Sequence, residues 1–173
     1  MSFIVRDERP GDEAAIHAIT AAAFHPMPYG DGTEPFIIDA LRASGDLTLS
    51  LVAEQDGEIV GQVTFSPVTI DAAAGDWFGL GPVAVAPARQ GEGIGGALIR
   101  EGLSRIRQMG AAGSVLTGDP AYYARFGFKG DCGLIYSDVP AKYVQAIAFD
   151  GDLPCGKLTF CDTFEAAAAN KDA

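Results

Sequence analysis

The stretch Arg89–Leu98, RQGEGIGGAL, constrains the fold most, because it places four glycines between an apolar run, LGPVAVAP (Leu80–Pro87), and a segment with helical periodicity. Glycine loses more conformational freedom on folding than any other residue, so a plain turn seldom uses so many. Successive backbone N–H groups at the start of a helix form an anion cradle, reinforced by the helix dipole. The stretch therefore predicts a strand, a tight loop that a ligand approaches closely, and a helix.

Two familiar nucleotide loops fit this stretch poorly. Gly91, Gly93 and Gly96 satisfy the dinucleotide pattern GxGxxG, but residues 86–90, including Pro87, separate them from the strand, and the loop lies in mid-chain instead of opening a parallel sheet. A triphosphate loop needs Gly-Lys-Ser/Thr, whereas alanine and leucine follow these glycines. A pyrophosphate cradle and a bland strand-to-helix connection remain as the interpretations.

Apolar periodicity along the chain predicts the order strand, two helices, three antiparallel strands, helix, strand, helix and further strands. The second helix is expected from Thr33 or Glu34 to Ala43, with Thr33 as its cap, Phe36 on its apolar face and Gly45 at its end. The strands are predicted at residues 3–7, 47–54, 59–70, 77–85, 114–118, 133–136, 143–149 and 157–160. This order indicates an α+β (mixed α/β) fold with a largely antiparallel first half.

The composition excludes several classes of protein. A net charge of −11, from 12 Lys+Arg and 23 Asp+Glu, argues against a nucleic-acid partner. Three cysteines without a CxxC pair suit free thiols in a reducing compartment, and two histidines leave few ligands for a metal. The apolar runs are too short to span a membrane, and the N-terminus lacks the pattern of a signal peptide. We expect one cytoplasmic domain, residues 1–173, with a frayed tail over 163–173.

Two motifs carry a resemblance to a known family. Gln90-x-x-Gly93-x-Gly95 resembles the Q/R-x-x-G-x-G/A coenzyme A motif of the GNAT superfamily of N-acetyltransferases, and residues 123–128, YARFGF, resemble its later Tyr-x-x-x-Gly-Phe signature. The order of elements over residues 3–130 is similar to that family's layout. The phrase GDPAYYARFGF, with SPV at Ser66–Val68, further resembles a bacterial branch of predicted acetyltransferases. The resemblance implies a GNAT-like acyl-CoA N-acyltransferase fold, in which helices flank a mostly antiparallel twisted sheet and residues 131–162 add C-terminal strands.

The resemblance also implies a reaction, the transfer of acetyl from acetyl-CoA to an amine. A backbone N–H near Val83 would hold the thioester oxygen, and Tyr123, protonated at pH 7, would donate a proton to the departing thiolate, with Tyr122 as a rival. The implied cofactor-binding residues are Val83, Ala84, Val85, Arg89, Gln90, Gly91, Glu92, Gly93, Ile94, Gly95, Gly96 and Tyr123. Arg89, at the edge of the cradle, is expected to meet a further phosphate.

The sequence leaves the general base, the acceptor and the role of the C-terminal segment open. Glu34 is the candidate general base, and Asp31, His25 or a water relay would serve equally well. An acyl-CoA-binding regulatory or partner module without turnover is the alternative function, and an NAD-dependent oxidoreductase is a third. The acceptor is unassigned. The last forty residues are compatible with closing the acceptor site or with forming a homodimer interface.

Overall fold

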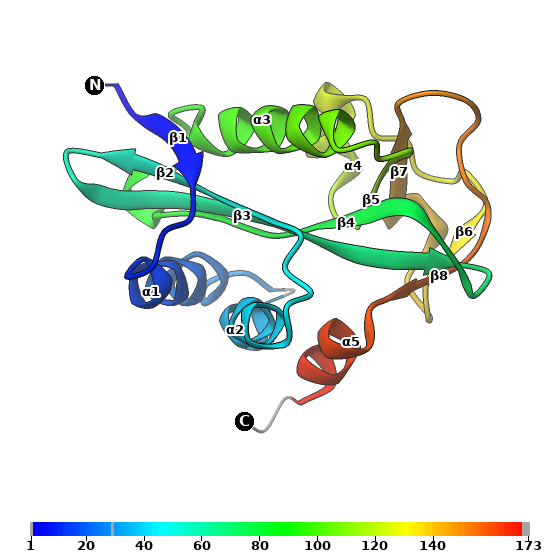
Figure 1. Ribbon diagram of the computed structural model, residues 1–173, viewed down its shortest axis with the longest axis horizontal. Coiled ribbons are helices and arrows are strands. Elements are labelled where there is room, and N and C mark those ends of the chain that lie inside the picture. Colours follow the sequence, from blue (N-terminus) through cyan, green and yellow to red (C-terminus); the bar gives the residue numbers. More distant parts are fainter. Residues whose placement is uncertain (1, 29, 171–173) are drawn as a thin grey trace.

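The computed structural model describes residues 2–28 and 30–170 (Figure 1). A central sheet has strand order β1-β2-β3-β4-β5-β7, and β8 joins it by pairing with β3. Of the pairs between named strands, β4–β5 and β6–β8 are parallel and the others antiparallel. The elements are β1 (Ile4–Asp7), α1 (Glu13–Phe24), α2 (Glu34–Ser44), β2 (Leu49–Gln55), β3 (Glu58–Ile70), β4 (Ala73–Val85), η1 (Pro87–Arg89), α3 (Ile94–Gln108), β5 (Gly113–Thr117), α4 (Pro120–Tyr123), η2 (Ala124–Phe126), β6 (Leu134–Ile135), η3 (Ala141–Tyr143), β7 (Val144–Ala148), β8 (Gly156–Phe160) and α5 (Asp162–Ala169). The predicted mixed α/β fold with a mostly antiparallel sheet is confirmed.

The hairpin of β2 and β3 forms where the sequence predicts it. Asp56 and Gly57 have φ values of 52° and 81°, and positive φ at both central residues is the requirement of the tight turn that suits twisted strands. β3 and β4 then continue as two strands of 13 residues each. These long strands form the middle of the sheet.

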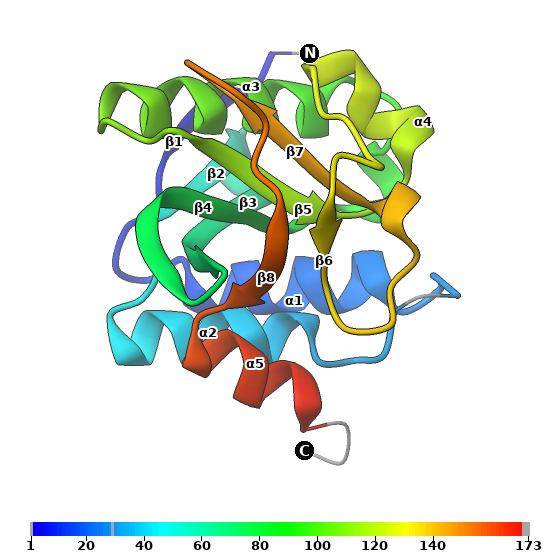
Figure 2. The ribbon, with the colours of Figure 1, turned by 90° about the vertical axis from the view of Figure 1, so that its right-hand side faces the viewer.

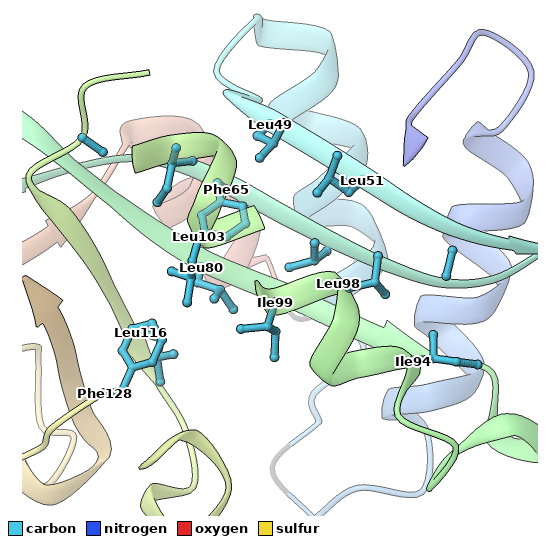
Figure 3. Packing of buried hydrophobic residues seen from close by; sticks show 14 of the residues in the cluster. Leu49, Leu51, Phe65, Leu80, Ile94, Leu98, Ile99, Leu103, Leu116 and Phe128 are labelled. Carbon is cyan, nitrogen blue, oxygen red and sulfur yellow. The ribbon is translucent and has the colours of Figure 1, made fainter. Parts of the chain in front are cut away.

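Helix α3 covers one face of the sheet, and α1 and α2 lie on the other (Figure 1). The core under α3 is apolar: Phe65, Leu98 and Ile99 are fully buried there (Figure 3). The Phe65 ring lies so close to α3 that a Cβ on Gly102 would overlap it, so the helix needs glycine at this position. α3 is the crossover that lets β4 and β5 run parallel.

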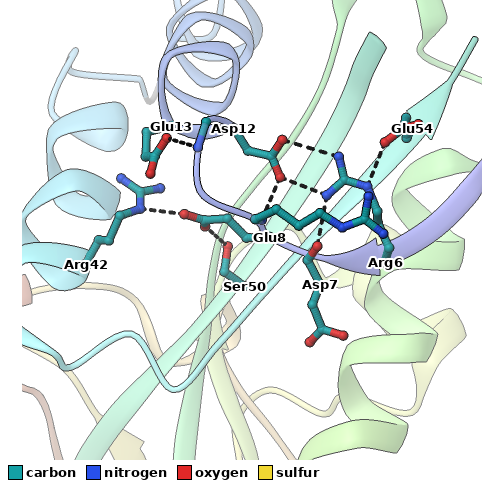
Figure 4. Close-up of polar contacts among 10 residues, drawn as sticks. Arg6, Asp7, Glu8, Asp12, Glu13, Arg42, Ser50 and Glu54 are labelled. Atoms are coloured by element: carbon teal, nitrogen blue, oxygen red, sulfur yellow. Dashed lines mark hydrogen bonds and ion pairs between the residues drawn. The ribbon is translucent and has the colours of Figure 1, made fainter. Parts of the chain in front are cut away.

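Ion pairs fasten the N-terminal strand to the sheet and to α1 (Figure 4). Arg6 Nε lies 2.6 Å from Glu54 Oε2 and its Nη1 lies 2.8 Å from Asp12 Oδ2. The hydrogen bond from Arg6 lowers the pKa of the Asp12 carboxyl. Nearby, Arg42 of α2 pairs with Glu8 at 2.5 Å.

Two details of α2 differ from the prediction. Thr33 does not cap the helix through its side chain, because its backbone is already helical and its hydroxyl is bonded to Asp31. Asp31 Oδ1 also accepts from Thr33 N at 3.0 Å. Phe36 is 44% exposed instead of sharing the apolar face, and its ring packs edge-on against His17 at 5.0 Å. Gly45, with φ of 83°, ends the helix as predicted.

Residues 163–169 of the predicted tail belong to α5; residues 171–173 lie outside the described part. α5 packs beside α2 (Figure 2). Phe164 stacks on Phe160 of β8 with ring centroids 4.4 Å apart. Glu165 accepts hydrogen bonds from Phe160 N and Tyr136 Oη, both at 3.1 Å. The tail is therefore held by tertiary contacts to β8.

Candidate active site

A gap in strand pairing opens beside β4. β4 and β5 pair only where Trp77–Gly79 meets Gly113–Val115, and from Leu80 onward no described strand lies on this side of β4. A β-bulge accompanies the change. One residue of β3 separates the pairs Val63–Val83 and Phe65–Leu80, whereas two residues of β4, Gly81 and Pro82, separate them. Gly81 has φ of 131°, which only glycine adopts readily. The bulge of β4 therefore lies at Gly81 and Pro82.

The hydrogen-bond pattern fixes which backbone groups of β4 face the gap. Ala86 N donates to Val60 O at 2.9 Å, so these two residues form a hydrogen-bonded pair across β3 and β4. Bonded and non-bonded pairs alternate along an antiparallel ladder, and the register then makes Val83 and Val85 non-bonded residues. Their N–H and C=O groups consequently point away from β3. Val85 O accepts from Gln90 Nε2 at 3.3 Å, which ties the loop to the strand.

The glycine-rich loop leads from this gap into the N-terminus of α3. Gly93 is the cap residue with φ of 83°, and the first intrahelical hydrogen bond runs from Ala97 N to Gly93 O at 3.0 Å. The N–H groups of Ile94, Gly95 and Gly96 precede that bond and point out of the helix end. The Ile94 side chain is 1% exposed and anchors the turn in the core. This is the geometry of an anion cradle.

Arg89 is held within the loop and not extended from its edge. Its Nη2 lies 2.7 Å from Glu92 Oε2 and is also hydrogen-bonded to Gln55. The hydrogen bond from Arg89 lowers the pKa of the Glu92 carboxyl. To meet a phosphate, the guanidinium would have to share or leave Glu92. The expected phosphate contact of Arg89 therefore stays a prediction.

The two tyrosines of α4 take different places. Asp119 caps this short helix by accepting from Ala121 N at 2.9 Å. Tyr123 packs edge-on against Phe128 at 6.0 Å. The Tyr122 hydroxyl lies against α3, 3.1 Å from where a Cβ on Gly95 would stand, and burial raises the pKa of that phenol. Tyr122 Oη and Val85 Cγ2 both lie beside Gly95, and the rings of Tyr122 and Tyr123 are 5.0 Å apart, so the structure brings these three predicted residues together; Val83 packs against the same apolar cluster.

Glu34 does not join that group. It lies in the first turn of α2, on the opposite face of the sheet from α3, and is 9% exposed. Its Oε1 accepts from Asp31 N at 3.1 Å, and its Oε2 is buried without a hydrogen-bond partner among the described residues. His25 and Asp31 are exposed. A general base stays unassigned.

Sequence reasoning missed two side chains that reach β4 from β3. Gln62 Nε2 and Thr64 Oγ1 donate to Pro82 O at 3.2 and 3.0 Å. Their spacing of two puts them on one face of the strand, but the sequence does not reveal that this face is buried. Within residues 2–28 and 30–170, no three His, Cys, Asp or Glu side chains gather as a metal site, and no helix is both long and apolar enough to cross a membrane.

Comparison with known proteins agrees with this architecture. The family model described as an acetyltransferase (GNAT) domain matches residues 46–130. An uncharacterized N-acetyltransferase of Escherichia coli, YhbS, is 38% identical over 128 residues, which is 73% of this chain and 74% of the relative. The chain belongs to the GNAT family of acetyltransferases.

Two solved structures define the branch more closely. A GNAT family acetyltransferase from Brucella melitensis, crystallised with acetyl-CoA, is 51% identical with a TM-score of 0.85, covering 94% of this chain and 98% of that one. E. coli YhbS in complex with CoA also has a TM-score of 0.85, with 31% identity over 94% of this chain and 92% of that one. The chain is thus similar to bacterial GNAT proteins that bind CoA or its acetyl thioester.

Proposed function

We propose that the protein transfers the acetyl group of acetyl-CoA to a primary amine, on a small molecule or on a protein. One observation carries this proposal: the unpaired side of β4 at Val83 and Val85 leads directly into the cradle at the N-terminus of α3. An extended pantetheine arm would bond to the free ladder as an added strand does, and the pyrophosphate would rest on the amides of Gly91–Gly96. The complexes of the relatives with acetyl-CoA and CoA support it.

The transfer would proceed by direct attack. The amine nitrogen bonds to the thioester carbon, and the carbonyl oxygen becomes negative beside the Val83 N–H. An oxyanion donor of this kind is worth about 3 kcal/mol where it has been measured. The intermediate collapses as the carbon–sulfur bond breaks; nitrogen loses a proton to water, and Tyr123 protonates the thiolate. The products are the acetylated amine and free CoA.

Calorimetry followed by a thiol-release assay tests the proposal. We expect CoA and acetyl-CoA to bind competitively to the folded protein and NAD not to bind. An amine panel with acetyl-CoA should then yield free thiol with at least one amine. No binding of either CoA species would refute the proposal. Binding without thiol release from any amine would favour a regulatory module that has lost turnover.

A further inference from the structure

A row of buried polar side chains runs along β3 beneath the bulge of β4. Gln62, Thr64 and Ser66 alternate along the strand, and each is 0% exposed. Gly61 and Phe65 face α3, so the row points to the opposite face, where α1 and α2 lie. Fully buried polar side chains are uncommon in a core and need hydrogen-bond partners.

Two members of the row converge on a single oxygen. Gln62 Nε2 and Thr64 Oγ1 donate to Pro82 O at 3.2 and 3.0 Å. The Pro82 carbonyl and the Val83 N–H belong to one peptide unit, and this unit is trans, as peptide bonds before a non-proline residue are. In a trans peptide the C=O and N–H point in opposite directions. Two donors on the carbonyl therefore fix where the Val83 N–H points.

Using both Gln62 and Thr64 as donors to the single Pro82 carbonyl has an energetic cost. Gln62 Oε1 is buried and has no hydrogen-bond partner among the described residues, and leaving such an atom unpaired is unfavourable. An apolar side chain at position 62 would avoid that penalty, and Thr64 alone would still bond Pro82 O. Hydrogen bonds in a chain polarise one another, so donors on the carbonyl make the N–H of the same peptide a stronger donor.

We infer that Gln62 and Thr64 are positioning residues that aim and strengthen the Val83 N–H as the oxyanion donor. This inference rests on the proposed function. Neither side chain touches the cofactor; both act through the Pro82–Val83 peptide. When the amine attacks and the thioester oxygen gains its charge, the donor is already aligned and no reorganisation is needed.

Nuclear magnetic resonance of 15N-labelled protein tests the inference without an acceptor. The Val83 amide resonance should shift between the CoA and acetyl-CoA complexes, because only acetyl-CoA brings a thioester oxygen. In Thr64→Val and Gln62→Met the free protein's Val83 resonance should already be displaced, and the difference between the two complexes should shrink. Thr64→Ser, which keeps the donor, should restore the wild-type pattern.

Ser66→Ala is the matched control. It removes an equally buried hydroxyl from the same row, and that hydroxyl has no hydrogen-bond partner in the described chain. Its Val83 resonance should stay in place. With an amine that the enzyme accepts, Thr64→Val should lower kcat about tenfold and leave KM for acetyl-CoA unchanged. This fall in kcat is smaller than the fall caused by removing an oxyanion donor itself.

The outcomes separate the two proposals. If wild-type protein binds neither CoA nor acetyl-CoA, the proposed function fails. If both bind and the Val83 resonance is the same in Thr64→Val and wild type, the function stands and the positioning role is overturned. A Val83 resonance displaced equally by Ser66→Ala would also overturn it, because the effect would then belong to any change in the row.

Discussion

Valine substitutions at Gly95, Gly93 and Gly45 should separate loss of cofactor binding from loss of stability. Gly95 lies within the first turn of α3, and an added Cβ would stand 3.1 Å from Tyr122 Oη and 3.5 Å from Val85 Cγ2. The Tyr122 hydroxyl is the end of a rotatable side chain and can move by a few tenths of an ångström. Because valine also forms helix somewhat better than glycine, Gly95→Val should change stability by less than about 1 kcal/mol.

Gly93 and Gly45 differ from Gly95 in their backbone. Both have φ of 83° and open space where a Cβ would lie. A side chain in this left-handed conformation costs about 1–2 kcal/mol, which corresponds to about 2–8 °C in the melting temperature of a chain of this size. Gly93→Val and Gly45→Val should therefore lose similar stability. Gly45 ends α2, away from the cradle, so only Gly93→Val should also lose CoA binding.

Circular dichroism melting without cofactor, followed by calorimetry with CoA, measures both properties. We expect Gly95→Val to melt near the wild type and to lose CoA affinity by more than about 100-fold, since its side chain would stand where the pyrophosphate must approach. Gly45→Val should melt lower and keep its affinity. A folded Gly95→Val protein with wild-type affinity would refute the cradle.

Three other predictions follow from the structure. Tyr123→Phe should lower kcat by at least about tenfold while acetyl-CoA affinity is kept, and an unchanged rate would remove Tyr123 from the mechanism. Because Arg6 lowers the pKa of Asp12, the stability from this carboxylate is complete above its ordinary pKa near 4 and is lost as the pH falls through the lower folded value. Urea unfolding of Asp12→Asn should thus differ from wild type at pH 7, and the difference should shrink in acid; a constant difference would contradict this. Phe164→Ala should cost about 2 kcal/mol in the same assay, because it removes the stack on Phe160, whereas no loss would mean that α5 contributes little.

The sequence predicts the parts of the fold and of the site that local rules determine. The Asp56–Gly57 turn, the end of α2 at Gly45 and the cradle depend on backbone conformations that glycine adopts readily, so their signals lie within a few residues. Tyr123 was identified only through a family motif, and its catalytic role stays a prediction.

Longer-range features could not be predicted from the sequence in this way. The tail 163–169 looks like a fraying alanine-rich end, and it forms a helix because Phe164 and Glu165 contact β8. Gln62 and Thr64 resemble any polar positions on an alternating strand. Their bonds to Pro82 depend on the extra residue of the β4 bulge, about twenty positions away, and no local pattern encodes that register.

The unpaired side of β4 has a consequence for the protein when no ligand is bound. A bare ladder of N–H and C=O groups is a template onto which a strand from another chain can add, the usual first step of edge-to-edge aggregation. A thioester cofactor lying along Val83 and Val85 would block that addition. Bound cofactor would therefore oppose self-association of the protein through this edge.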